Sequence, residues 1–313
     1  METLKLGTRG SQLALFQAQT VASLLRTHAG VSCAIVVIRT SGDRLAEAPL
    51  SDIGGKRLFV KEIEDALLGG EVDLAVHSSK DMPAVQPEGL SIGAVLVRED
   101  ARDALVLPAG RSQLAPSPRI GTGSIRRIAQ LRTLYPDATF LPIRGNLDTR
   151  LRKLDSGDYD ALVLAAAGLR RLQHHERISA YLPADACVPA PGQGIIAVEI
   201  RSGDRRVHQA VRTIDDPVAA AALTAERAVV TTLGGGCQMP IGAHATLSGG
   251  TLSLTAIVIS IDGARSARAE AHGPAAEAAR IGREAAALLL QRGAREILAE
   301  VERAQGAVEG LQP

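Results

Sequence analysis

Residues 3–11 have the sequence TLKLGTRGS, and this stretch decides the fold class that we expect. Residues 3–8 predict a strand, the Gly and Ser residues predict a turn, and Ser11 is a typical N-cap for the apolar helix that follows. The same order returns at residues 119–124, RIGTGS, where Ser124 precedes another helix. Repeated strand-turn-helix units predict an α/β protein with more than one such unit.

Residues 72–83, VDLAVHSSKDMP, form a short apolar strand that runs into consecutive polar residues and a proline. In an open α/β sheet, ligands bind beyond the carboxyl ends of the strands, where these polar residues would lie. Lys80 and Asp81 place a cation and a carboxylate side by side, which favours a functional site over an exposed ion pair of little effect. Arg9, after the first strand, could bind a carboxylate, and a solvated turn arginine is an equal alternative.

Arg126 and Arg127 fall in the first turn of the helix that begins after Ser124. Cations there oppose the helix dipole and cost about 0.3–1 kcal/mol each with nothing bound, so the pair predicts an anionic ligand. Further basic residues lie at strand ends and helix starts of the same region: Arg144, Arg150, Arg152, Lys153, Arg170 and Arg171. This pattern predicts a ligand with several carboxylates or phosphates.

The remaining chain predicts a hinge, a returning strand and a small α+β unit. Residues 188–194 are rich in Pro and Gly, as hinges are, and the nearly all-apolar stretch Ile195 to Ile200 predicts a central parallel strand that rejoins the first unit. A helix near 218–230, short strands over 243–272 and two Ala-rich helices should follow. We expect the tail after Arg303 to be frayed.

Composition excludes several classes of function. The chain has 313 residues, which predicts two or three domains, and its net charge of +1 excludes a generally basic surface. Only 2% of residues are aromatic and Trp is absent, which argues against stacking platforms for nucleic acid. No apolar run is long enough for a membrane span, and the N-terminus lacks a signal-peptide pattern. We expect a soluble, cytoplasmic protein with no nucleic-acid or membrane partner.

The cysteines are few, and one lies in an unusual loop. Cys33, Cys187 and Cys237 are far apart, which suits a reducing compartment and lacks metal-ligand spacing, so no metal is expected. Cys237 follows three glycines and precedes Pro240, so a flexible run and a rigid one hold its thiol on a turn. A small buried apolar residue is the alternative, because free cysteines are often buried.

Together these residues resemble the porphobilinogen deaminase (hydroxymethylbilane synthase) family, from Leu6 to about Glu300. Each motif is modest alone, but their order and spacing are highly specific. The motifs are Gly7-Thr8-Arg9-Gly10-Ser11, Gly54-Gly55-Lys56, Asp73-Leu74-Ala75-Val76-His77-Ser78 with Lys80-Asp81, Gly121-Thr122 with Ser124 and Arg126-Arg127, Arg144-Gly145-Asn146, Gly192-Gln193-Gly194, and Gly235-Gly236-Cys237-Gln238.

The resemblance implies an α/β fold with two periplasmic-binding-protein-like α/β domains around a cleft plus a small C-terminal α+β domain. The expected division is residues 1–98 and 193–214 for the first α/β domain, 99–192 for the second, and 215–313 for the domain that carries the cysteine. It also implies a transferase that acts in tetrapyrrole (haem) biosynthesis, and we expect a monomer.

The resemblance further implies a dipyrromethane cofactor, bound to Cys237 through a thioether and assembled by the enzyme from its own substrate. Porphobilinogen loses ammonia to give an azafulvene-like electrophile, which the free end of the cofactor attacks. Four such additions give a tetrapyrrole, which water releases as hydroxymethylbilane. A thiol is a suitable nucleophile for attaching such a cofactor.

Residue roles carried over from the resemblance begin with Asp81, which would contact the pyrrole nitrogens, stabilise the cationic intermediate and help to move protons. The expected cofactor contacts, besides Cys237 and Asp81, are Lys80, Thr122, Ser124, Arg126 and Arg127. The expected substrate ligands are Arg9, Ser11, Arg144, Arg150 and Arg171, together with Lys56 and Phe59 on a mobile loop.

Two other functions are compatible with parts of the pattern. A non-catalytic polyanion-binding module of the periplasmic-binding-protein type would also combine two hinged α/β domains with basic strand ends, but it would need no covalent primer on Cys237. A thiol-transfer enzyme that uses Cys237 is disfavoured, because the sequence has no CxxC motif or nearby resolving cysteine.

Overall fold

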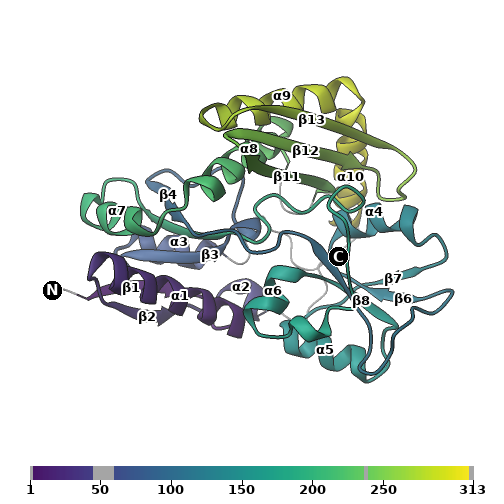
Figure 1. Cartoon of the computed structure of the whole chain (residues 1–313), viewed down its shortest axis with the longest axis horizontal. Helices are drawn as coiled ribbons and strands as arrows, with labels where there is room; N and C mark the ends of the chain where they lie inside the picture. Colours follow the sequence, from purple (N-terminus) through teal and green to yellow (C-terminus); the bar gives the residue numbers. More distant parts are fainter. Residues whose placement is uncertain (1–2, 45–59, 236–238, 310–313) are drawn as a thin grey trace.

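The computed structural model describes residues 3–44, 60–235 and 239–309. The strands of these ranges form two five-stranded sheets and one three-stranded sheet (Figure 1). The predicted α/β class, with two α/β sheets and a small C-terminal α+β part, is confirmed. No helix in the described ranges has the length and apolar character needed to cross a bilayer.

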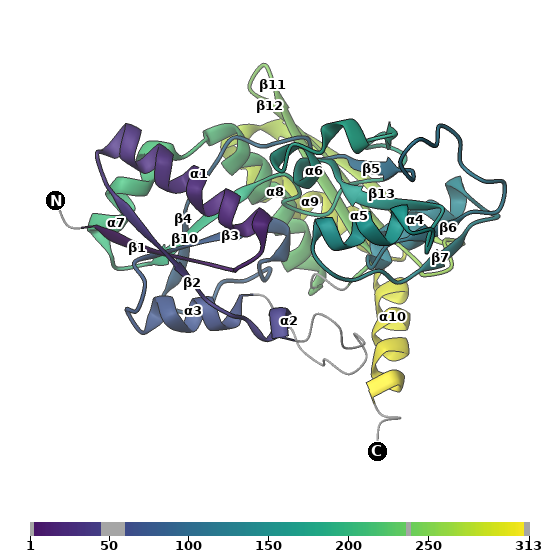
Figure 2. The same cartoon turned by 90° about the horizontal axis from the view of Figure 1, so that it is seen from below.

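The first sheet contains the N-terminal strands and one strand from much later in the chain. Its order is β2 (Cys33–Val37), β1 (Leu4–Thr8), β3 (Leu74–Ser78), β10 (Ile196–Arg201) and β4 (Leu90–Val95). Helices α1 (Gln12–Ala29) and α3 (Lys61–Leu68) cover its opposite faces, as Figure 2 shows, and α2 (Ser41–Arg44) and α7 (Arg205–Val211) complete this part. Leu6 and Leu25 pack in one face, and Ile63 and Ala75 pack in the other.

Strand β10 rejoins the first sheet as expected, but the prediction of a parallel strand was wrong. It pairs antiparallel with both β3 and β4. The chain returns to the first sheet beside the carboxyl end of β3, where Ile196 pairs with Ser78, so the strand can only run back along β3. Its apolar sequence indicates burial on both faces, which a central antiparallel strand shares with a parallel one.

The second sheet has the order β7 (Thr139–Leu141), β6 (Arg119–Gly121), β8 (Ala161–Ala165), β5 (Asp103–Val106) and β9 (Ala180–Tyr181). Its helices are α4 (Ile125–Leu134), α5 (Leu147–Asp155) and α6 (Ala166–Arg171). The side chain of Ser124 accepts a hydrogen bond from the Arg127 amide, and Ser11 does the same for Ala14 at the start of α1. Both predicted N-caps are confirmed.

The C-terminal part combines three antiparallel strands with three helices. Strands β11 (Ile241–Ser248), β12 (Thr251–Ile259) and β13 (Ser266–Pro274) form a meander, which packs on α8 (Pro217–Leu233) and α9 (Ala278–Gln291). Helix α10 (Ala294–Glu309) follows, so the predicted fraying after Arg303 was wrong for the described backbone. In Figure 1 this green and yellow layer lies above both five-stranded sheets.

The chain crosses between the two large sheets twice, and the two crossing segments lie side by side. The Glu99 amide donates to the Gly194 carbonyl at 3.0 Å, and a Cβ on Gly194 would lie 2.3 Å from the Glu99 carbonyl oxygen. Gly194 also has a φ of +86°, so only glycine fits there without strain. The expected domain boundaries fall near these crossings, and the exact division stays a prediction.

A buried carboxylate of α8 binds both crossing segments. Glu226 is fully buried and pairs with Arg98 at 2.6 Å, while it accepts hydrogen bonds from the Gly192 amide at 2.6 Å and the Ala245 amide at 2.7 Å. Arg98 also donates through Nε to the Gln193 carbonyl at 2.9 Å. The C-terminal part is therefore joined to the segments that connect the two sheets.

Candidate active site

The polar residues predicted at the end of β3 lie in a short 3-10 turn, Ser79–Asp81, beyond the carboxyl end of the strand. Lys80 and Asp81 are both partly buried there. Burial lowers the pKa of Lys80 to about 8, the neighbouring Asp81 carboxylate opposes this shift, and Arg127 adds to it. Lys80 therefore lies close to the basic residues of α4, which belongs to the other large sheet.

The start of α4 carries the two arginines that the sequence singled out. Arg126 and Arg127 are 4% and 6% exposed, and both contact Asp103 of β5, which is completely buried. Arg126 Nη2 lies 2.8 Å from Asp103 Oδ2, while Arg127 Nε and Nη2 lie 2.9 and 2.7 Å from Oδ1. Burial alone would raise the pKa of Asp103, but the two guanidinium groups outweigh it and hold that pKa well below its usual range.

Contrary to the expectation from the sequence, Arg126 and Arg127 do not need an external anion to be stable. Asp103 supplies an internal carboxylate that pairs with both. Asp103 was not among the predicted site residues, although a lone acidic residue within the apolar strand DALV is a signal, because a buried Asp is almost always paired. One carboxylate cannot neutralise two guanidinium groups, so this end of α4 keeps an excess positive charge that can attract an anion.

Helix α5 and the turn before it add two more predicted ligands, Arg150 and Arg144, to the same region. Burial lowers the pKa of Arg150 to about 10, Arg127 adds to the shift, and Asp81 opposes it. The Arg150 Nε donates to the Gly145 carbonyl at 2.8 Å, which holds the side chain near Arg144. The Nη2 atom of Arg144 is buried and has no hydrogen-bond partner in the described structure. A buried donor without a partner is costly, so Arg144 is suited to bind an acceptor from a ligand.

These residues form one group, which we call the basic cluster: Lys80, Asp81, Asp103, Arg126, Arg127, Arg144 and Arg150. Five of its members are cationic and two are carboxylates. It draws on both large sheets, because the charge of Asp81 in the first sheet shifts the pKa of Arg150 in the second. The cluster can neutralise several ligand carboxylates while it keeps one carboxylate, Asp81, for a cationic centre.

Thr122 and Ser124 lie in the turn between β6 and α4, next to the basic cluster. Thr122 is 1% exposed, and its Oγ1 accepts a hydrogen bond from the Ser124 amide at 3.3 Å. Both hydroxyls therefore help to shape the turn, and their role as cofactor contacts stays a prediction.

Arg9 and Ser11 follow β1, which lies next to β3 and runs parallel to it, so both strands end at the same edge of the sheet. Arg171 lies elsewhere, since its Nη2 donates to the Gly194 carbonyl at 2.7 Å and burial lowers its pKa to about 10. The contacts of Arg171 join α6 to a crossing segment and do not link it to the basic cluster. The substrate roles of all three residues stay predictions.

Three predicted residues lie outside the described residues, namely Cys237, Lys56 and Phe59. Helix α8 ends at Leu233, four residues before Cys237 in the sequence, and Gly234 with a φ of +69° forms its left-handed cap. The other two thiols are poor nucleophiles at neutral pH, because burial raises the pKa of Cys33 to about 11 and that of Cys187 to about 12. Within the described ranges, no group of His, Cys, Asp and Glu has the arrangement of a metal site.

Known proteins resemble this chain over almost its whole length. Residues 4–209 match the model for "Porphobilinogen deaminase, dipyromethane cofactor binding domain", and residues 220–291 match the one for "Porphobilinogen deaminase, C-terminal domain". A porphobilinogen deaminase of Syntrophobacter fumaroxidans is 48% identical over 96% of this chain and 98% of its own length. One from Moorella thermoacetica is 48% identical over 99% of this chain and 100% of its own.

Solved structures include more distant likenesses. Immunogenic lipoprotein A from Vibrio vulnificus is 12% identical with a TM-score of 0.43, covering 69% of this chain and 96% of that one. A periplasmic substrate-binding protein from Coxiella burnetii is 13% identical with a TM-score of 0.42, covering 70% and 94%. No function follows from likenesses of this size. The two family models and the near full-length relatives show that the chain belongs to the porphobilinogen deaminase family.

Proposed function

We propose that this chain condenses four molecules of porphobilinogen stepwise, with loss of ammonia, onto a dipyrromethane primer bound to Cys237, and releases hydroxymethylbilane by hydrolysis. The observation that carries the proposal is the basic cluster, in which a single accessible carboxylate, Asp81, lies among cations from both large sheets. Such a site suits a chain of pyrroles, because each ring carries two carboxylates and each condensation passes through a cationic ring.

The residues present fit a bound dipyrromethane. Arg144 has a buried donor without a hydrogen-bond partner in the described structure, and the Arg126–Arg127 pair has only one carboxylate to share. Arg126, Arg127, Lys80, Thr122 and Ser124 would hold the carboxylates of the group. The dipyrromethane supplies a nucleophilic pyrrole carbon to which the incoming unit is joined.

Asp81 performs the chemistry that the chain itself contributes. Its carboxylate accepts hydrogen bonds from pyrrole N–H groups and stabilises positive charge as ammonia leaves the substrate. It can also take the proton that the ring carbon loses after each new bond forms. Arg144 and Arg150 bind the acetate and propionate groups of the incoming unit, which orients its reacting carbon.

Attachment at Cys237 is tested by the intact mass of the purified, untreated protein. We expect an adduct of two pyrrole units on the chain, and we expect Cys237→Ser to lack it. Cys33→Ser is the matched control and should keep the adduct, because burial raises the pKa of that thiol. A wild-type chain without an adduct would favour the non-catalytic polyanion-binding module, and a freely titrating Cys237 would favour a thiol-transfer enzyme.

The pKa of Lys80 gives a pH-dependent prediction. Lys80 carries its charge below about pH 8 and loses it above that value, so the KM for porphobilinogen should rise as the pH passes through about 8. Lys80→Arg keeps a cation over this range and should flatten the change, while any titration of the substrate affects both proteins equally. A KM that changes equally with pH in the two proteins would remove Lys80 from ligand binding.

We also propose that the protein acts in the cytoplasm and as a monomer. The few, widely spaced cysteines support action in a reducing compartment such as the cytoplasm, and a monomeric enzyme suffices because every proposed site residue belongs to one chain.

A further inference from the structure

Helix α8 contacts the segment that follows Asp81, and in the sequence it ends shortly before Cys237. It ends at Leu233, just before the glycine-rich loop that contains Cys237. Near its middle, successive residues point to different partners: Glu226 binds the crossing segments, and Arg227 binds the segment that directly follows Asp81. The same helix therefore contacts the neighbourhood of Asp81 and leads into the loop that would carry the primer.

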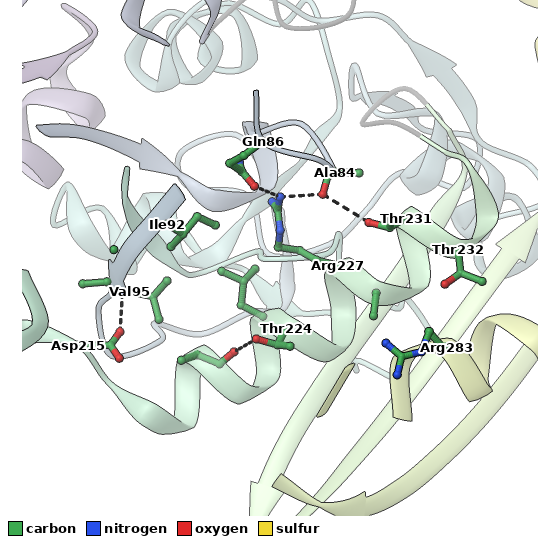
Figure 3. Close-up of a pocket in the computed structure, with 15 residues that line it drawn as sticks. Ala84, Gln86, Ile92, Val95, Asp215, Thr224, Arg227, Thr231, Thr232 and Arg283 are labelled. Carbon is green, nitrogen blue, oxygen red and sulfur yellow. Dashed lines mark hydrogen bonds between the residues drawn. The ribbon is translucent and has the colours of Figure 1, made fainter. Parts of the chain in front are cut away.

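Arg227 donates hydrogen bonds to residues 83–86, and Figure 3 shows those to Ala84 and Gln86. Its Nη2 donates to the Pro83 carbonyl and to the Ala84 carbonyl, both at 2.8 Å, and to the side-chain oxygen of Gln86. Thr231, one turn further along the helix, donates to the same Ala84 carbonyl at 3.4 Å. A charged donor that binds backbone carbonyls directly fixes the path of that backbone.

The position of this segment determines the position of Asp81. Met82 connects the two and is 4% exposed, in a cluster with Ala219 and Leu223 of α8. Beyond Met82, Ala84 and Gln86 line a cavity of about 490 Å³ together with Arg227, Thr231 and Arg283, among others. Arg227 is the charged contact that holds this segment against the helix, beside the hydrogen bond of Thr231 and the packing of Ala84 against the C-terminal core.

We propose that Arg227 is a positioning residue for the condensation reaction, which holds Asp81 in place through residues 83–86. This inference rests on the proposed roles of Asp81 and Cys237. Arg227 would act through residues 83–86, so its loss should slow the chemical step and leave substrate binding largely unchanged. A displacement of about 1 Å in a catalytic group can cost up to about 100-fold in rate.

The test compares Arg227→Ala, Arg227→Lys and Arg283→Ala in the full-length, primer-loaded enzyme. Arg227→Ala should lower kcat about 10–100-fold with little change in the KM for porphobilinogen. Arg227→Lys should recover part of this loss, because one nitrogen makes the three contacts with residues 83–86, and an ammonium nitrogen can also donate hydrogen bonds to these acceptors. Arg283 lines the same cavity, and its substitution should leave kcat unchanged.

A double-mutant cycle separates positioning from a purely structural role. If Arg227 acts through Asp81, Arg227→Ala should lower the single-turnover rate much less in an Asp81→Asn background than in the wild type. Equal losses in both backgrounds, or an unchanged kcat in a loaded Arg227→Ala enzyme, would overturn the inference. The intact mass of the wild type distinguishes a failure of this inference from a failure of the proposed function. In the second case the wild type itself would lack the primer.

Discussion

Asp81→Ala is expected to lower kcat by about 100–10,000-fold, the usual contribution of a positioned acid–base group or charge stabiliser. In the described structure Asp81 lies within the basic cluster. Its negative charge partly offsets the lowering of the pKa of Lys80 and of Arg150 by burial. Within the described residues, Asp81 is the carboxylate of that cluster without an ion pair, in contrast to Asp103, which two arginines bind. Steady-state kinetics with porphobilinogen measure the effect.

Two controls make the Asp81 result specific. Thermal unfolding of Asp81→Ala should resemble that of the wild type, because the side chain is only partly buried. Intact mass tells whether the variant carries the primer, so a failure of chemistry can be told apart from a failure of loading. Asp81→Asn keeps the shape and removes the charge, and it should be nearly as slow as Asp81→Ala. Substantial turnover in a loaded Asp81→Asn enzyme would show that the charge is not required.

The elements that the sequence predicted well are those fixed by neighbouring residues. The N-caps at Ser11 and Ser124 were correct because a cap needs only a serine and the backbone amides three residues on. The polar end of β3 was correctly placed beyond the strand, because the change from apolar to polar residues is itself local. Lys80, Arg127 and Arg150, which the sequence places at strand ends and helix starts, lie close together in the structure, and their roles as ligands stay predictions.

The features that the sequence did not predict depend on residues far apart in the chain. The direction of β10 depends on where the second crossing segment enters the first sheet, and an apolar run contains no information about direction. The pairing of Asp103 with Arg126 and Arg127 requires β5 and α4 to be adjacent in space. The contacts of Arg227 with residues 83–86 are of the same kind, since they join α8 to a distant loop.

The Asp103 cluster leads to the prediction with the largest effect on stability. The guanidinium groups of Arg126 and Arg127 and the carboxylate of Asp103 are almost fully buried beside the second sheet. Gln193 Nε2 also donates to Asp103 Oδ1 at 2.9 Å. Removal of the only negative charge would leave two buried cations without compensation in the described surroundings. Such a break typically costs about 3–5 kcal/mol, because the remaining charges stay buried and lose their partner.

Asp103→Asn is therefore expected to lower the free energy of unfolding by about 3–5 kcal/mol, as measured by urea denaturation at neutral pH. Because the folded protein lowers the pKa of Asp103, its contribution is present above the ordinary Asp pKa of about 3.9 and is lost as the pH falls below that value. The difference in stability between wild type and Asp103→Asn should accordingly shrink in acid. Primer loading should also decrease, since Arg126 and Arg127 lose the group that orients them.

Asp160→Asn is the matched control, because Asp160 also pairs with an arginine of the second sheet, Arg119, at 3.1 Å. That pair is largely exposed, so water compensates both charges and the substitution should change the denaturation midpoint very little. The two substitutions remove the same charge from the same sheet and differ mainly in burial. If Asp103→Asn unfolded at the same urea concentration as Asp160→Asn, the buried carboxylate would not be what holds Arg126 and Arg127 in place, and another source of compensation for their charge would have to exist.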